Sequence, residues 1–187
     1  MRIICVCTGS KFDYWYVDNL RHMIDNFSGL EYDAFEVLTE SKYGGVYDKL
    51  QMFDRFRTGQ NLYFDLDVVI TGDCNKFLAE NLTVCKAYWR EDYHSPINSS
   101  IISWRGDQSH VFKLFDENPD RFKRMYYRGI DQYIHKNFKY NMFYEGFCSY
   151  KEVKKYDKQY QVYIFNQNYE VMRWKSWCQK FLLAQRT

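Results

Sequence analysis

Proline is scarce in this sequence of 187 residues, which contains only two, and no stretch is dominated by Gly, Ser or Pro. Linkers between domains are commonly rich in these residues, so we expect a single domain over residues 1–187. Hydrophobic residues make up 46% of the chain and charged residues 27%, a balance that excludes a disordered or collagenous protein. A chain of this length buries roughly 70% of its unfolded surface, so its core needs no disulfide or structural metal.

Long hydrophobic runs are also missing. The longest apolar stretches, such as residues 3–6 and 68–70, are far shorter than the roughly 20 residues that a transmembrane helix needs. The apolar start of the chain is too short for a secretory signal and leads directly into the turn residues Thr8-Gly9-Ser10. We therefore expect no membrane span and a cytoplasmic location.

Neither sign of charge dominates, because 26 Lys and Arg residues stand against 24 Asp and Glu residues, for a net charge of +2. This balance excludes the basic character of a general nucleic-acid binder. The six cysteines form no CxxC pair and no zinc-type spacing with the four histidines, so free thiols are expected. Basic and aromatic residues alternate over 121–128 and 151–158, which fits either a solvated face or a surface for an anionic acceptor.

The first seventy residues alternate between strand and helix patterns. Apolar runs predict strands over 2–8, 32–38 and 61–64, and apolar residues spaced by three and four predict helices over 13–27 and about 43–57. This alternation predicts an α/β fold with a mostly parallel central sheet flanked by helices. The rest of the chain is expected to mix strands (82–89, 99–104, 139–147, 161–165) with helices (108–116, 130–137, 169–184).

Two aspartates, Asp65 and Asp67, flank Leu66 at the end of the third predicted strand. The Asp-x-Asp spacing is common by chance, so its apolar surroundings carry the information. An ionised carboxylate in such surroundings is costly unless a cation compensates it, and carboxylates suit Mg²⁺ or Mn²⁺. Ligands of open α/β sheets also bind beyond the carboxyl ends of the strands. A strand-end turn capped by the aspartates is the alternative interpretation.

Six segments match, in the same order, the motifs of one enzyme family. The matching residues are 35–40, Lys49, the Asp-x-Asp strand over 62–70 with Thr71-Gly72-Asp73, the Asn-Ser segment over 98–105, Gly129-Ile130-Asp131-Gln132 and Ser149-Tyr150-Lys151. They resemble the GT-A glycosyltransferases, in particular the glycogenin-like and lipopolysaccharide galactosyltransferase-like branch. The resemblance spans nearly the whole chain. It implies one Rossmann-like GT-A domain, with a nucleotide-binding half over about 1–70 and an acceptor half with a C-terminal helix over about 71–187.

The resemblance also implies which residues bind the donor. Asp65 and Asp67, with Leu66 between them, would hold a Mn²⁺ or Mg²⁺ ion that bridges the diphosphate and stabilises the leaving nucleotide. The other implied donor contacts are Thr8, Gly9, Thr39 and Glu40 at the nucleoside, Lys49 at the phosphates, and Asn98 and Ser99 at the sugar hydroxyls.

Asp131 and Gln132 would lie near the reacting carbon as catalytic residues, according to the same resemblance. Asn98 and Asp131 each have a structural alternative, because Asn98 also suits a turn and Asp131 also suits the first turn of a helix. The chain departs from the family over residues 165–169, where a metal-binding His and a diphosphate-binding Lys are missing. Asn166 is the candidate third metal ligand, and Arg173 or Lys175 is the candidate replacement for the lysine.

We therefore predict a metal-dependent glycosyltransferase. It would transfer a hexose, with retention, from a nucleotide-diphosphate sugar, with a UDP-sugar favoured, to a glycan, lipid-linked glycan, protein or modified nucleic acid. The alternative is a degenerate GT-A domain that binds nucleotide or glycan without turnover, as the missing His and Lys suggest. A nucleotidyltransferase also uses paired carboxylates and Mg²⁺, but the sequence has no Gly-rich phosphate loop with a lysine.

Overall fold

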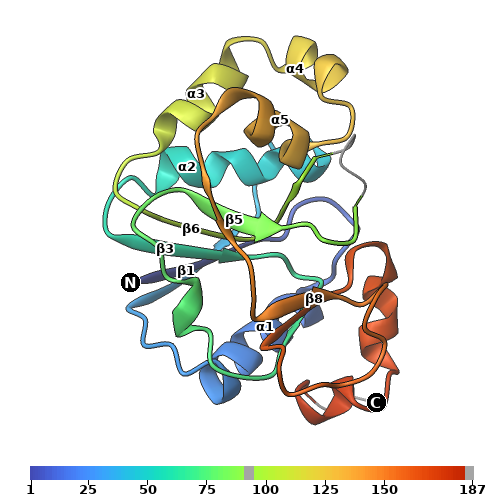
Figure 1. The fold of residues 1–187 in the computed structure, drawn as a ribbon. Helices are drawn as coiled ribbons and strands as arrows, with labels where there is room; N and C mark the ends of the chain where they lie inside the picture. The colour runs from blue at the N-terminus through green and yellow to red at the C-terminus, as the bar shows by residue number, and fades with distance from the viewer. Residues whose placement is uncertain (91–94, 184–187) are drawn as a thin grey trace.

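The computed structural model describes residues 1–90 and 95–183 (Figure 1). In these two ranges, a larger sheet has the strand order β2-β1-β3-β6-β5-β7 and a smaller sheet has the order β4-β9-β8. The strands of the larger sheet are β1 (Arg2–Val6), β2 (Ala34–Leu38), β3 (Gln60–Phe64), β5 (Thr83–Lys86), β6 (Ile97–Arg105) and β7 (Asn141–Phe143). Strand β6 is antiparallel to β3 and β5, whereas the other neighbours pair in parallel. The larger sheet is thus mostly parallel, as the sequence predicts.

Side chains of β1 alternate between two hydrophobic cores, one on each face of the larger sheet. Ile3 and Cys5 pack with helix α1 (Tyr14–Phe27), whereas Ile4 belongs to the core on the opposite face. Figure 1 shows α1 below the sheet and α2 (Gln51–Arg55), α3 (Ser109–Glu117) and α5 (Ile130–Asn137) above it. Helices on both faces of a mostly parallel sheet give the predicted α/β architecture.

Helix α1 begins at a capped end that also shapes the preceding loop. The side chain of Asp13 accepts a hydrogen bond from the backbone nitrogen of Trp15 at 3.1 Å, as a helix N-cap does. The apolar residues Val17, Leu20 and Ile24 then recur on one buried face of the helix. The cap and the buried face together fix the short loop over residues 7–13, which leads from β1 into α1.

The Asp-x-Asp segment joins the two sheets. The smaller sheet consists of β4 (Val68–Ile70), β9 (Val162–Ile164), which is antiparallel to β4, and β8 (Phe147–Ser149), which is parallel to β9. The backbone nitrogen of Asp65 donates to the carbonyl of Ser100 in β6 at 2.8 Å, and the backbone nitrogen of Phe165 donates to the carbonyl of Asp67 at 2.8 Å. Asp65 is therefore anchored to the larger sheet and Asp67 to the smaller one.

The C-terminal segment is not the single helix that the sequence predicts over 169–184. Up to residue 183, it forms two 3₁₀ segments, η3 (Asn166–Arg173) and η4 (Cys178–Lys180). Asn166 has a φ of 53° and Asn168 has non-helical angles, so the backbone bends before a regular helix can form. The bends allow Met172 and Cys178 to enter the same core. Residue 184 lies outside the described part of the chain.

Three other differences are local. Gly146, with a φ of 85°, ends the strand expected over 139–147 and divides it between β7 and β8. Helix α4 (Pro119–Met125) was not predicted, although Asn118 caps it by accepting from the nitrogen of Arg121 at 3.1 Å. The helix expected over 43–57 begins as the 3₁₀ segment η1 (Gly45–Leu50) before α2, and another short 3₁₀ turn, η2, covers Asn75–Phe77. Across the described ranges, no helix is long and apolar enough to cross a membrane.

Candidate active site

Asp65, which is partly buried, forms an ion pair with the buried Lys49 at the carboxyl end of β3. The Nζ atom of Lys49 lies 2.7 Å from Oδ1 of Asp65 and donates to the carbonyl oxygen and the Oγ atom of Ser99 at 3.0 and 3.3 Å. An ammonium group has three donors, so these contacts use all the donors of Lys49. Lys49 therefore positions Asp65 in this structure.

Asp65 is held in its ionised form. Burial by itself raises the pKa of Asp65, but the charge of Lys49 and the hydrogen bonds from Lys49, Tyr63 and Ser100 outweigh it and lower that pKa below its ordinary value. The Tyr63 hydroxyl donates to the same oxygen that Lys49 contacts. These contacts leave the other carboxylate oxygen of Asp65 as the better candidate for a cation ligand.

Asp67 lies in a different electrostatic environment. Its side chain is 8% exposed, and the Nζ atom of Lys11 lies 3.9 Å from its Oδ2 atom. Burial and the nearby charge of Asp65 raise the pKa of Asp67 to about 7, against the weaker opposing effects of Lys11 and Lys49. A bound cation would stabilise the anionic form, so Asp67 has the properties of a cation ligand.

The donor atoms around Asp67 fit Mg²⁺ or Mn²⁺. Over residues 1–90 and 95–183, no cluster of three or more His, Cys, Asp and Glu side chains is present, so two carboxylates form the basis of the site. Mg²⁺ is commonly held by one or two carboxylates, with water and phosphate oxygens completing its shell. Asn166, the predicted third ligand, directly follows Phe165, whose backbone nitrogen bonds the Asp67 carbonyl. Asn166 thus lies one residue from a backbone hydrogen bond to Asp67.

Asp131 belongs to the same network of contacts. It lies in the first turn of α5, where its Oδ1 atom accepts from the backbone nitrogen of Ser99 at 2.9 Å and its Oδ2 atom accepts from Arg90 at 2.6 Å. Ser99 also accepts from Lys49, which pairs with Asp65. Two predicted site residues that are far apart in sequence are therefore connected through Ser99 and Lys49.

A cavity of about 190 Å³ lies between the loop after β1 and the segment η1. Its polar side chains are Thr8, Lys11, Lys49, Tyr63, Asp65 and Asp67. The structure thus brings one predicted nucleoside contact, Thr8, together with both predicted metal ligands. This donor cavity, as we name it, is smaller than the roughly 300 Å³ at which typical ligand pockets begin.

The other predicted nucleoside contacts, Gly9, Thr39 and Glu40, do not line this cavity. Gly9 is exposed in the turn after β1 and has a φ of 69°, which favours glycine. Thr39 and Glu40 are exposed after β2, and the Glu40 carboxylate pairs with Arg55. The side chain of Leu66 is buried in the core, so the backbone of Leu66 is the part available to a ligand.

Asn98 and Gln132 make local hydrogen bonds. The Oδ1 atom of the buried Asn98 accepts from the backbone nitrogen of Ser100 at 3.0 Å, the contact of a turn-type asparagine. Gln132 is partly buried, and its Oε1 atom accepts from the backbone nitrogen of Arg128 at 3.4 Å. Both lie on elements that carry the network, β6 and α5.

Asp48 is a site residue that the sequence analysis missed. Its buried carboxylate accepts from the Ser41 hydroxyl at 2.6 Å, from the backbone nitrogens of residues 42–44 at 2.9, 2.7 and 3.1 Å, and from the Thr8 hydroxyl. Burial raises the pKa of Asp48, but these hydrogen bonds outweigh it and lower that pKa. Asp48 thus fixes the loop before η1, and the charged pair Asp48-Lys49 between apolar neighbours was the available signal.

Lys11 and Arg90 were missed as well. Each is a single basic residue in a loop, where no spacing or periodicity marks it in the sequence. Their roles depend on aspartates that lie far away along the chain, Asp67 for Lys11 and Asp131 for Arg90. Only the folded arrangement could identify them.

No protein-family model and no curated protein sequence matches the chain, whereas solved structures do. A glycosyltransferase involved in glycosylation of the major capsid of PBCV-1 is 12% identical, with a TM-score of 0.58 over 91% of this chain and 98% of that one. The galactosyltransferase LgtC, in complex with donor and acceptor sugar analogues, is 10% identical, with a TM-score of 0.63 over 100% of this chain and 98% of that one.

The glycosyltransferase GlyE of Streptococcus pneumoniae TIGR4 is 10% identical, with a TM-score of 0.69 over 98% of this chain and 61% of that one. Structural matches at such low sequence identity show a shared fold alone. The chemistry of this chain depends on the residues of its own site. The sheet order, the helices on both faces and these matches agree with the resemblance in the sequence, and the chain has the GT-A fold of these glycosyltransferases.

Proposed function

We propose that this protein is a metal-dependent glycosyltransferase. It transfers a hexose from a nucleotide-diphosphate sugar, with a UDP-sugar favoured, to an acceptor, with retention of configuration. The observation that carries the proposal is the position of Asp65 and Asp67, which share one cavity at the junction of two sheets in a GT-A fold. The LgtC structure contains donor and acceptor sugar analogues, which supports the same pair of substrate classes here.

Asp65 and Asp67, with Asn166 as the third candidate, would hold a Mn²⁺ or Mg²⁺ ion together with the donor diphosphate. When bound, this ion supplies Lewis-acid stabilisation of the leaving nucleotide. Lys49 keeps Asp65 ionised and oriented, since its three donors are fixed by Asp65 and Ser99. Thr8 and the loop that Asp48 fixes would border the nucleoside.

Asp131 and Gln132 are the residues that we assign to the transferred sugar. Arg90 and the backbone nitrogen of Ser99 hold the Asp131 carboxylate in place, so Asp131 can accept a hydrogen bond from a sugar hydroxyl without having to reorient. Gln132 follows Asp131 in α5 and adds an amide donor. One of the matched LgtC structures carries a glutamine-to-glutamate change at its active site, which supports a glutamine in this role.

A second cavity, of about 430 Å³, is suited to the acceptor. Its aromatic side chains are Tyr88, Trp89, Tyr144, Phe147 and Tyr160. Aromatic rings offer flat apolar faces to the C–H groups of a sugar, and the carboxylates of Glu145 and Glu152, which also line the cavity, can accept from hydroxyls. Trp89, which lines this cavity, directly precedes Arg90, the partner of Asp131, so the cavity is linked to that residue along the backbone.

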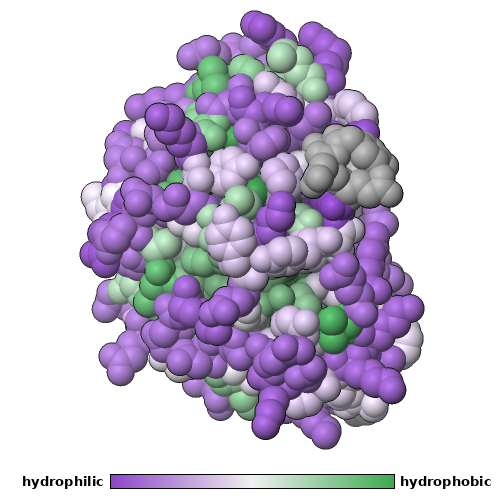
Figure 2. Space-filling model, in the orientation of Figure 1, coloured by the Kyte–Doolittle hydropathy of each residue, from purple (hydrophilic) through white to green (hydrophobic). Residues whose placement is uncertain are grey.

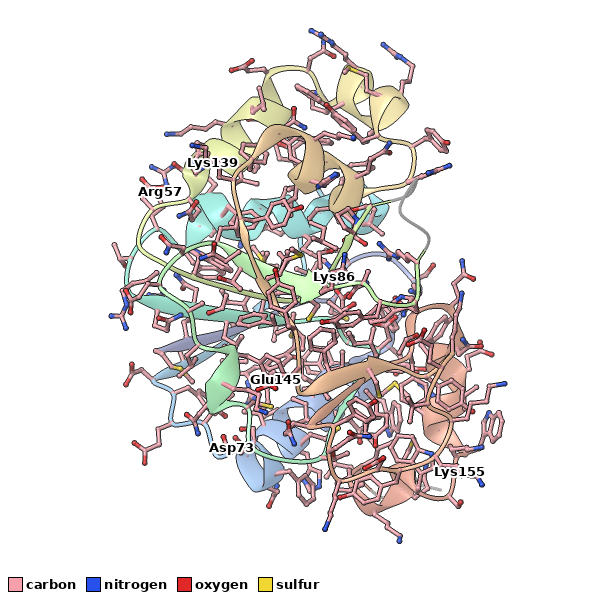
Figure 3. All side chains as sticks on the ribbon, in the orientation of Figure 1. Arg57, Asp73, Lys86, Lys139, Glu145 and Lys155 are labelled. Carbon is pink, nitrogen blue, oxygen red and sulfur yellow. The ribbon has the colours of Figure 1, made fainter. Side chains whose placement is uncertain are left out.

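Glu145, which lines the second cavity, lies on the face shown in the figures. Figure 3 shows Glu145 and Lys86 in the middle of that face, whereas Asp73, Lys139 and Lys155 lie nearer its edges. Figure 2 shows hydrophilic side chains over most of the same face and a band of weakly polar and apolar ones across the middle. A glycan acceptor fits such a surface because a sugar has both apolar and polar faces.

Thermal unfolding with UDP, GDP, ADP and CMP, each with and without Mn²⁺ or Mg²⁺, tests the proposal without knowledge of the acceptor. At 100 times its Kd, a ligand adds about 2.7 kcal/mol, which raises Tm by roughly 5 to 10 °C in a domain of this size. We expect a rise that needs both a nucleoside diphosphate and the metal. This rise should disappear in the Asp65→Ala/Asp67→Ala variant. Absence of any rise in the wild type would contradict the proposal.

A degenerate domain that binds a nucleotide without turnover is the second candidate. The observation that favours it is the two-carboxylate site, since no third His, Cys, Asp or Glu ligand joins the pair in the described residues. Incubation of the metal-loaded protein with nucleotide sugars separates the two candidates, because even slow transfer to water releases nucleoside diphosphate. Binding of the donor without any release above that of the Asp65→Ala/Asp67→Ala variant would favour the degenerate domain.

A further inference from the structure

Lys11 lies in the loop between β1 and α1, beside the donor cavity. Its Nζ atom is 3.9 Å from Oδ2 of Asp67, which is longer than a direct hydrogen bond, and its side chain is 52% exposed. The same Nζ atom lies 4.5 Å from the ring centroid of Phe12 and 4.9 Å from that of Tyr169. Cation–π contacts with two rings hold the ammonium group of Lys11 toward the carboxylates while leaving its donors accessible.

Three other cations of this region are already engaged. Lys49 uses its donors on Asp65 and Ser99, and Arg90 donates to Asp131 and to the carbonyl of residue 97. Arg173 pairs with Asp13. In the part of the chain that the structure describes, the cations that line the donor cavity are Lys11 and Lys49. Lys11 has the longer polar contact of the two, so its donors are available to a ligand.

We propose that Lys11 binds the diphosphate of the donor and stabilises the charge that develops on the leaving nucleotide. This inference rests on the proposed function. Lys49 cancels the charge of Asp65, and Asp67 offsets part of the charge of a divalent cation, so the cation and the carboxylates leave the diphosphate incompletely neutralised. Lys11 supplies the remaining positive charge at the side of the cavity where Asp67 lies.

The position of Lys11 also suits a change of partner. In the absence of ligand, its ammonium group is the nearest cation to Asp67 and partly balances that carboxylate. A divalent cation on Asp67 repels the ammonium group, and a diphosphate bound to the same cation attracts it. The flexible side chain of lysine allows this short movement, since the exposed half of its stem is not packed.

The test compares Lys11→Met with two other lysine variants. Lys42→Met is the matched control, because Lys42 is also about half exposed, at 45%, and its Nζ atom also lies over two rings, 5.2 Å from Tyr43 and 4.8 Å from Phe112. Lys175→Met tests the rival candidate, whose Nζ atom lies 6.0 Å from the ring of Tyr150. A fourth variant, Lys11→Arg, keeps the charge.

Calorimetry measures the Kd values of UDP and of uridine, each in the presence of Mn²⁺. Pyrophosphate with Mn²⁺ is a third probe, which reports on the phosphates without the base. We expect Lys11→Met to weaken UDP and pyrophosphate binding about tenfold or more, the usual scale of a lost charge-assisted contact, and to leave uridine binding unchanged. Lys11→Arg should keep most of the affinity, and Lys42→Met and Lys175→Met should bind all three probes like the wild type.

The outcomes separate this inference from the proposed function. If the wild type binds neither UDP nor pyrophosphate, the donor site itself is wrong and the role of Lys11 is lost with it. If the wild type binds both and Lys11→Met binds them equally well, the role of Lys11 alone is overturned. If Lys175→Met weakens UDP and pyrophosphate binding and Lys11→Met does not, the diphosphate contact belongs to Lys175 and the role of Lys11 is overturned. Unchanged Tm values of the ligand-free variants exclude an effect through folding.

Discussion

Asp65 and Asp67 are separated by one residue, yet they belong to two regions with opposite properties. Asp65 is anchored to the larger sheet through Ser100, and its carboxylate is paired with Lys49. Asp67 is anchored to the smaller sheet through Phe165, and the Nζ atom of Lys11 lies 3.9 Å from its carboxylate. The same residue type thus has a lowered pKa in the first region and a raised pKa in the second.

This difference indicates that the two aspartates have different roles. The protein itself satisfies Asp65, so that side chain keeps its position and charge with or without a ligand. Asp67 is kept buried and weakly paired, which destabilises the ligand-free protein and makes a cation the natural partner. Functional sites commonly retain such unfavourable groups because a ligand relieves them.

Asp65→Asn should have the largest effect on stability. It would leave the buried ammonium group of Lys49 without its ion-pair partner, and we expect a loss of about 3 kcal/mol, near the low end for a broken buried pair because Asp65 is partly exposed. Urea unfolding at pH 7 measures this change. In the wild type, the lowered pKa means that the contribution of Asp65 is present above its unfolded pKa and is lost as the pH falls through its folded pKa.

The double variant Asp65→Leu/Lys49→Met is the control for that loss. An apolar pair of similar volume removes the charge on both sides, so it should recover much of the stability that Asp65→Asn loses. Equal stability of Asp65→Asn and the wild type would show that the ion pair does not hold this region together.

Asp67→Asn should act in the opposite direction. The pKa of Asp67 is raised to about 7 in the folded state, so between its unfolded value and that pH the folded protein binds more protons than the unfolded one. Stability of the metal-free protein should therefore fall as the pH rises from 5 to 8. Asp67→Asn should remove this dependence and add about 1 to 4 kcal/mol at pH 8, the upper figure being the full free energy of the shift.

Urea unfolding in EDTA at several pH values measures this effect, with Asp73→Asn as a control at an exposed aspartate that lies outside the site. The same Asp67→Asn protein should lose metal-dependent nucleotide binding. A lower stability of Asp67→Asn at pH 8 would contradict the contrast between the two aspartates.

Asn166→His should have the smallest effect and tests whether the smaller sheet supplies a further ligand. Histidine tolerates a positive φ better than most residues, so the backbone at Asn166, with its φ of 53°, should accept it. We expect Mn²⁺-dependent UDP binding to tighten a few-fold, under about 1 kcal/mol, since imidazole is a good Mn²⁺ ligand. Asn166→Gly keeps the backbone freedom and removes the side chain, so weaker binding in that variant would support Asn166 itself as a ligand.

The parts of the fold that the sequence could predict are those with local signals. Strands β1 to β3 and helix α1 follow from apolar periodicity and from the cap at Asp13, and the position of Asp65 after β3 follows from the end of an apolar run. Strand β4 has only three residues and pairs with β9, which lies almost a hundred residues away. So short a strand has no detectable period, and its partner is set by tertiary packing.

The sequence could predict several main residues of the candidate site, but not the contacts that connect them. Family motifs indicated Asp65, Ser99 and Asp131, whereas no motif or spacing marks Lys11 in its loop. The use of Lys49 as the partner of Asp65 depends on atomic distances that no spacing encodes. The C-terminal bends at Asn166 also depend on backbone angles that an apolar pattern with helical spacing does not reveal.

The burial of Leu66 has a consequence for which cations the site accepts. Leu66 joins the two aspartates and is 2% exposed, with its side chain fixed in the core. Core packing around Leu66 therefore constrains the distance between the two carboxylates, because a close-packed core tolerates little change in volume. Mg²⁺ needs ligands at about 2.0 to 2.1 Å and Ca²⁺ accepts 2.3 to 2.6 Å, so at the proposed cation site we expect the hydrophobic core to influence selection by ionic radius.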